Sequence, residues 1–156
     1  MNDPRATVGA KTLPLQGPVN LVVRGLLATP LLCRLAGRRL ITVYLVGRKS
    51  GRNFSVPVAY TRYNGYLLVG TQFAWARNLH TGEPVEIRLL GKRQSADVRV
   101  LTDQSGVVEH FALIARDNHQ FARFNKIGFD QLGEPRTDDL NRAWLAGARV
   151  VMLDPQ

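Results

Sequence analysis

Apolar residues form short β-branched runs or alternate with polar residues through the middle of the chain, and both patterns predict β-strands. Six segments show them: residues 40–46, 54–63, 66–70, 85–90, 95–101 and 148–153. Asn64-Gly65, between two of these segments, is a strong signal for a two-residue hairpin turn. A second hairpin is expected around Gly91-Lys92-Arg93. The strands should therefore pair antiparallel.

Helical spacing of apolar residues flanks this strand region on both sides. Before it, we predict two short helices, about 19–28 and 30–36, with Gly37 as the stop. After Thr102 three more are expected, and their marker residues are Val107, Phe111 and Ile114, then Phe121, Phe124 and Ile127, then residues 138–146. Residues 1–17 contain two prolines and two glycines and are expected to be a flexible tail, so residues 18–155 form one α+β domain with an antiparallel barrel or sheet.

Composition narrows the class of protein. The chain has 156 residues, of which 45% are hydrophobic and 21% charged, as in ordinary globular domains. Its formal net charge of +9 favours an anionic partner, such as a phosphorylated cofactor, a nucleic acid or an anionic membrane. Basic residues are not interleaved with aromatic ones along a strand, so a nucleic-acid module is not favoured. The single cysteine, Cys33, excludes an intrachain disulfide, and we expect a cytoplasmic protein.

The most apolar early stretch runs from Val19 to Leu35. Arg24, Pro30 and Arg34 interrupt it, so it does not supply the roughly 20 apolar residues that cross a bilayer. Two interpretations remain open for this stretch. It forms an amphipathic helix that covers one end of the core, or it forms a basic helix that touches the inner membrane face peripherally.

The turn Gly47-Arg48-Lys49-Ser50-Gly51-Arg52 carries the clearest chemical signal. Its glycines let the backbone approach a ligand closely, and exposed N–H groups in such a turn can bind an anion. Arg48, Lys49 and Ser50 would add side-chain donors. The turn is therefore either a phosphate- or carboxylate-binding loop or a solvated basic hairpin turn.

A second candidate segment follows the strand at 66–70. Thr71 and Gln72 stand at the strand's end, where polar groups often meet a planar ligand, and Trp75 and Asn78 would share one face of a helical turn. The alternative is a core tryptophan with an asparagine that closes a loop. His80, His110 and His119 lack the spacing of metal ligands, so no metal site is expected.

Taken together, several motifs resemble the deazaflavin-dependent nitroreductase and quinone reductase family. They are the Gly47–Gly51 turn, Val56-Pro57-Val58, Asn64-Gly65, Trp75-x-x-Asn78-Leu79 and the closing stretch 148–155. The resemblance implies an antiparallel split β-barrel of the FMN-binding type with helices at the N-terminus and in the C-terminal half. It also implies a deazaflavin coenzyme, F-420, with its anionic tail on Arg48, Lys49, Ser50 and Gly51. Pro57 would support the ring, and Thr71, Gln72, Trp75 and Asn78 would lie near the ring or tail.

The implied activity is hydride transfer from the reduced coenzyme to a quinone-like, nitro or enone acceptor, with no catalytic side chain required. The Phe121–Phe124 region offers only phenylalanine as an aromatic residue, so we expect an apolar acceptor pocket. Two alternatives stay open: a non-catalytic protein of the same fold that binds a fatty acid or lipid, and an oxidoreductase that uses FMN or haem. The sequence does not decide between a monomer and a homodimer.

Overall fold

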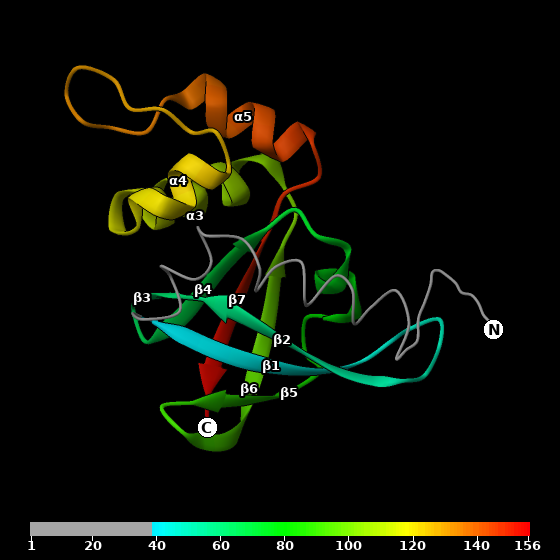
Figure 1. Ribbon diagram of the computed structural model, residues 1–156. Coiled ribbons are helices and arrows are strands. Elements are labelled where there is room, and N and C mark those ends of the chain that lie inside the picture. The colour runs from blue at the N-terminus through cyan, green and yellow to red at the C-terminus, as the bar shows by residue number, and fades with distance from the viewer. Residues whose placement is uncertain (1–38) are drawn as a thin grey trace.

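The computed structural model describes residues 39–156, which form one curled antiparallel sheet with helices against part of it (Figure 1). The strands are β1 (Leu40–Val46), β2 (Asn53–Ala59), β3 (Thr61–Tyr63), β4 (Tyr66–Thr71), β5 (Val85–Leu89), β6 (Lys92–Leu101) and β7 (Arg149–Pro155). Their order across the sheet is β2-β1-β5-β6-β7-β4-β3, and every neighbouring pair is antiparallel. The expected α+β class and antiparallel pairing are confirmed.

The sheet closes on itself because β2 and β3 stand at its two opposite edges although only Tyr60 separates them in the chain. The sequence predicted one strand over 54–63. That prediction is wrong at Tyr60, because the residues before it, in β2, pair with β1 and those after it, in β3, pair with β4. The Tyr60 N–H donates to the carbonyl of Arg39 over 3.1 Å. A flat sheet cannot place its two edges one residue apart, so the sheet is a half-barrel.

The sheet separates two apolar clusters. The first fills the concave interior and includes Ile41, Val43 and Ile87. The second lies between the outer face of β4 and β7 and the helices, and Phe111 is its largest fully buried side chain. Strand β7 serves both clusters, which explains why four successive residues, 150–153, are buried in a strand.

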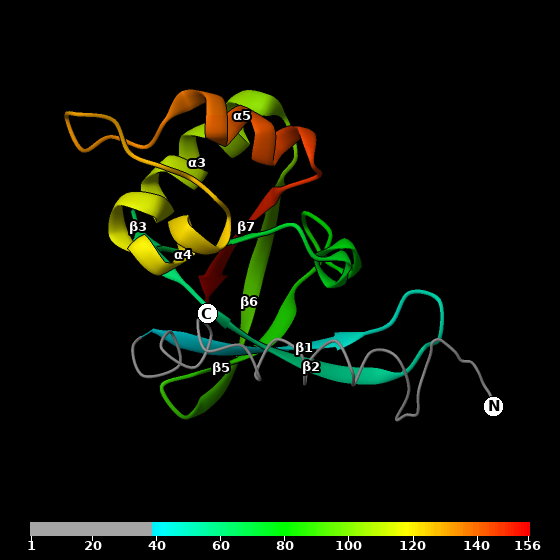
Figure 2. The same ribbon diagram turned by 45° about the horizontal axis from the view of Figure 1, so that its top comes forward.

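Four helices accompany the sheet: the 3₁₀-helix η2 (Ala74–Asn78), α3 (Gln104–Asp117), α4 (His119–Phe124) and α5 (Thr137–Leu145). Both views show α3, α4 and α5 gathered at one end of the molecule, whereas η2 lies apart from them (Figures 1 and 2). Asn118 separates α3 from α4, and its side chain accepts hydrogen bonds from the first N–H groups of α4.

Local turn chemistry confirms some boundaries and corrects others. Asn64 and Gly65 both have positive φ, as the predicted two-residue hairpin requires. The second hairpin turns at Leu90 and Gly91, one residue earlier than expected, so β6 already begins at Lys92. Ile127 lies beyond the end of α4, and Leu145, the last residue of α5, is 75% exposed.

The expected tail over 1–17, the helices over 19–28 and 30–36 with their stop at Gly37, and the membrane contact of Val19 to Leu35 lie outside the described residues. Within residues 39–156, none of the helices has the length and apolar character needed to cross a membrane.

Candidate functional site

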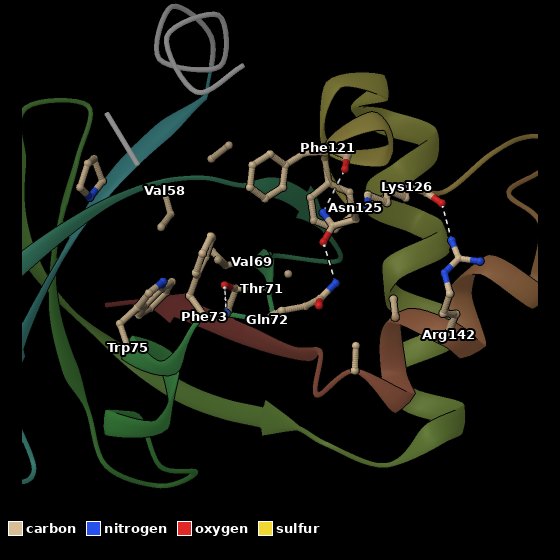
Figure 3. A pocket seen from close by; sticks show the side chains of 16 residues that line it. Val58, Val69, Thr71, Gln72, Phe73, Trp75, Phe121, Asn125, Lys126 and Arg142 are labelled. Atoms are coloured by element: carbon tan, nitrogen blue, oxygen red, sulfur yellow. Dashed lines mark hydrogen bonds between the residues drawn. The ribbon is translucent and has the colours of Figure 1, made fainter. Parts of the chain in front are cut away.

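A cavity of about 400 Å³ opens between the sheet and the helices (Figure 3). Pro57 and Val58 of β2 and Val69 of β4 supply apolar wall on the sheet side. Trp75 of η2 closes one side, and the C-terminal ends of α4 and α5 face the cavity from the other. A cavity of this size with mainly apolar walls suits a small organic molecule.

Polar side chains at the end of β4 are tied down by hydrogen bonds. The buried Thr71 hydroxyl accepts from the N–H of Phe73 over 3.0 Å, which turns the chain toward η2. The Gln72 side-chain amide donates to Oδ1 of Asn125 over 3.3 Å and so connects β4 with the end of α4 beside the cavity (Figure 3). Asn125 in turn donates to the carbonyl of Phe121.

Three phenylalanines, Phe73, Phe121 and Phe124, line the apolar part of the cavity. The Phe121 ring meets Phe111 edge-on with centroids 5.1 Å apart. Phe73 and Phe124, 6.1 Å apart, are partly exposed beside the opening. Gly70 makes this arrangement possible, since a Cβ there would lie 2.8 Å from the Phe111 ring and 2.9 Å from the Phe121 ring.

Two cationic residues, Lys126 and Arg142, line the helical side of the cavity. Arg142 forms an ion pair with Asp139 over 2.7 Å and donates from its other terminal nitrogen to the carbonyl of Lys126 over 2.7 Å. The hydrogen bond from the Gly128 N–H, followed by that from Arg142, lowers the pKa of Asp139 below its ordinary value. The carboxylate therefore stays charged and links the Arg142 side chain to the Gly128 backbone.

The Gly47–Arg52 turn is ordered by its own hydrogen bonds. The Gly47 N–H donates to the carbonyl of Arg52 and the Gly51 N–H donates to the carbonyl of Gly47, both over 2.8 Å. Gly51 has φ +69°, a conformation that favours glycine. The Ser50 hydroxyl accepts from the Arg52 N–H over 3.2 Å, so it caps the turn. Lys49, Ser50 and Gly51 are exposed.

Asn78 attaches this turn to η2. Its Oδ1 accepts from the Arg48 N–H over 2.8 Å, and its amide nitrogen donates to the carbonyl of Trp75 over 2.9 Å. Trp75 and Asn78 do not face the same space, in contrast to the expectation from helical spacing. Trp75 lines the cavity, whereas Asn78 and Arg48 line a second groove of about 370 Å³ that also contains Glu83 and Glu86.

Three arginines from different elements lie near enough to one another for their charges to interact. Arg48 belongs to the turn, Arg77 to η2, and Arg149 begins β7 in register with Thr71. Strand alternation places Arg149 on the interior face of the sheet, as it does Val151. Burial lowers the pKa of Arg149 below its ordinary value, and the positive charges of Arg77 and Arg48 lower it further. Among residues 39–156, none of the three forms an ion pair with a carboxylate.

The nine residues singled out from the sequence thus divide into groups. Four of them line the cavity: Pro57, Thr71, Gln72 and Trp75. Arg48 and Asn78 line the groove, and the other three stand at the exposed tip of the turn. Sequence reasoning missed Lys126, Arg77 and Arg149. Within residues 39–156, no three His, Cys, Asp or Glu side chains lie close enough together to hold a metal ion.

Comparisons with known proteins inform the fold. No family model matches the chain, and no curated protein does either. A pyridoxamine 5′-phosphate oxidase-related, FMN-binding protein from Nostoc punctiforme superposes with a TM-score of 0.50 over 88% of this chain and 81% of its own, at 15% identity. An FAD-binding protein from Mesorhizobium loti has a TM-score of 0.48 at 13% identity, over 82% of this chain and 90% of its own. A protein from Bacteroides thetaiotaomicron that is provisionally named a 5-nitroimidazole antibiotic resistance protein has a TM-score of 0.46 at 13% identity, over 80% of this chain and 79% of its own. The first match shows that the half-barrel has the fold of FMN-binding split-barrel structures.

Proposed function

We propose that the protein is an oxidoreductase that binds a deazaflavin coenzyme and transfers a hydride from it to a quinone-like, nitro or enone acceptor. The observation that carries the proposal is an apolar cavity lined by Trp75 of η2, together with three interacting arginines, one of them in η2, that form no ion pair within residues 39–156. A flavin-type coenzyme has the same two parts, a planar apolar ring and an anionic tail.

The cavity fits the ring of such a coenzyme. Its volume of about 400 Å³ falls within the range of roughly 300–1,000 Å³ that is usual for small-molecule sites. Trp75 is 6% exposed and therefore held firmly, so it can present a fixed surface to a planar ligand. Pro57 lies in β2, an edge strand, where proline is tolerated, and it lines the cavity.

The tail would lie on the arginines that meet around η2. Arg77 and Arg149 repel each other, and an anion placed between them would remove this repulsion. Arg48 and Lys49 extend the positive charge onto the exposed turn. The groove beyond Arg48 contains Glu83 and Glu86 and is therefore less suited to an anion, which favours the side of Arg77 and Arg149.

The reduced deazaflavin, when bound, supplies a hydride from its C5 carbon and becomes oxidised, while the acceptor gains that hydride and a proton from water. The protein's own contribution is to hold the ring against Trp75, to keep water from the apolar walls, and to place positive charge near the acceptor. The proposal requires no general base in the cavity. A split-barrel protein described as FMN-binding shares the fold, so FMN is the coenzyme to be tested beside deazaflavin.

A fluorescence titration tests this proposal. Purified protein is titrated into oxidised deazaflavin F-420 and, separately, into FMN. We expect tighter binding of the deazaflavin. The variant with Arg48→Ala and Lys49→Ala should lose about 2–4 kcal/mol of binding free energy, at about 1–2 kcal/mol per charge-assisted contact, and less at high salt. A matched variant with Arg62→Ala and Lys92→Ala removes two exposed charges elsewhere and should bind as the wild type does.

The second candidate, a lipid-binding protein without catalysis, is favoured by the apolar walls and by the lysine that lines the same cavity. It makes a different prediction. Purified protein would leave deazaflavin fluorescence unchanged and would release fatty acids on denaturation, as detected by mass spectrometry. That pair of results would replace the enzyme proposal.

A further inference from the structure

Lys126 occupies a backbone position at which glycine is usual. It follows the C-cap of α4 with φ +59°, its N–H donates to the carbonyl of Arg123 over 3.1 Å, and the next N–H, of Ile127, donates to the carbonyl of Ala122 over 2.8 Å. This pair of bonds is the Schellman ending of a helix, which favours glycine because a Cβ is strained at positive φ. The backbone conformation therefore does not explain why a lysine is present.

The surrounding residues fix this lysine beside the cavity. Arg142 donates to the Lys126 carbonyl over 2.7 Å (Figure 3). The Asp139 carboxylate binds both Arg142 and the N–H of Gly128. The charge of Arg142 is thus balanced by Asp139. Lys126 forms no ion pair within residues 39–156, so it supplies the uncompensated positive charge of the cavity lining.

We propose that the ammonium group of Lys126 binds an oxygen atom of the acceptor, a planar and largely apolar molecule with one carbonyl, nitro or ionised oxygen. The proposal rests on the proposed function, because it assigns the acceptor to the part of the cavity beside α4. Val58, Val69 and Phe121 line the cavity and would contact the apolar body. Negative charge develops on the acceptor's oxygen during reduction, and a cation held beside that oxygen stabilises the charge.

Two probes of equal shape and different charge test this assignment. 2-Naphthoate carries a carboxylate and 2-naphthamide is neutral, and neither is redox-active or reacts with the thiol of Cys33. Calorimetric titration without coenzyme should show the wild type binding naphthoate roughly five- to tenfold more tightly than naphthamide, where tenfold corresponds to about 1.4 kcal/mol. Lys126→Gln should bind both probes equally, and Lys126→Arg should keep the preference.

A second variant separates binding from folding. Lys126→Gly suits the positive φ, so it should unfold at the same or a higher temperature and still lose the preference for naphthoate. Arg123→Gln removes an exposed charge of the same helix that does not line the cavity and should keep the preference.

Three results would overturn the assignment: equal binding of the two probes by the wild type, an unchanged preference in Lys126→Gly, or no binding of either probe. Tighter binding of decanoate than of naphthoate would overturn the planar class of ligand in favour of an acyl chain. Because these titrations contain no coenzyme, their failure leaves the deazaflavin proposal standing, and the deazaflavin titration tests that proposal separately.

Discussion

The side-chain oxygen of Asn78 accepts a hydrogen bond from the backbone N–H of Arg48 over 2.8 Å, although the two residues are 30 positions apart in the chain. Its amide nitrogen is occupied as well, by the carbonyl of Trp75. One side chain therefore joins the basic turn to the 3₁₀-helix that closes the cavity. In the proposed enzyme, this joint sets where a coenzyme's tail would lie relative to its ring.

Replacing Asn78 tests the joint. Asn78→Ala removes two partly exposed hydrogen bonds and should lower the free energy of unfolding by roughly 1–2 kcal/mol, as measured by urea denaturation. Asn78→Asp keeps an acceptor for the Arg48 N–H, but it places a negative charge beside the arginines. It should therefore weaken deazaflavin binding more than it lowers stability. If Asn78→Ala and Asn78→Asp changed the free energy of unfolding and the deazaflavin affinity to the same extent, Asn78 would not have the proposed role in joining the turn to η2.

Gly70→Ala should close the apolar part of the cavity. The new methyl group would overlap the rings of Phe111 and Phe121, and overpacking of this kind costs about 1–3 kcal/mol of stability. Thermal unfolding and the naphthoate titration measure the two consequences. Phe121→Leu in the same chain should restore part of the lost stability, since it removes the ring that is displaced. A double variant no more stable than Gly70→Ala alone would argue against the clash.

Low pH should weaken the contacts of Asp139 with Arg142 and Gly128 beside Lys126. The pKa of Asp139 is lower in the folded protein than its ordinary value of 3.8, because the Gly128 N–H and Arg142 donate to the charged form. The stability that this carboxylate contributes is therefore fully present above about pH 4 and is lost as the pH falls through the folded-state pKa. Asp139→Asn should be less stable than the wild type at pH 7, with a difference that shrinks at lower pH. Asp138→Asn, which removes a neighbouring exposed carboxylate, serves as the control.

An anion should stabilise the group formed by Arg48, Arg77 and Arg149. Inorganic pyrophosphate that binds the folded protein raises its unfolding temperature by mass action. We expect this rise in the wild type and a smaller one after Arg77→Gln with Arg149→Gln, at equal ionic strength maintained with sodium chloride. Without pyrophosphate, the double variant should be at least as stable as the wild type, because two mutually repelling charges are gone. An identical rise in the unfolding temperature of both proteins would show that Arg77 and Arg149 do not bind the anion.

Local patterns predicted most of the strands because their causes are local. Leu40–Val46 is found as predicted, since β-branched residues and an alternating buried face decide it. Asn64-Gly65 forms its turn because these two residues tolerate positive φ. The break at Tyr60 has no local signal. It follows from pairing with β1 on one side and β4 on the other, which only the closed sheet determines.

The candidate site was predicted less completely for a related reason. Motif spacing identified Thr71 and Trp75, which lie four positions apart in the chain and line the same cavity. Arg149 joins Arg48 and Arg77 only through strand order, and no spacing in the sequence connects them. Lys126 was missed because the apolar spacing of Phe121, Phe124 and Ile127 predicted a continuous helix. The helix ends earlier, in a motif in which glycine, the usual sequence signal, is absent.

A crystal structure of the complex with oxidised deazaflavin would test the central claim most directly. The coenzyme's ring should lie against Trp75 in the cavity, and its phosphate should lie within hydrogen-bond distance of Arg48, Arg77 or Arg149. A ring bound outside the cavity, or a tail that extends into solvent away from these three side chains, would contradict the account.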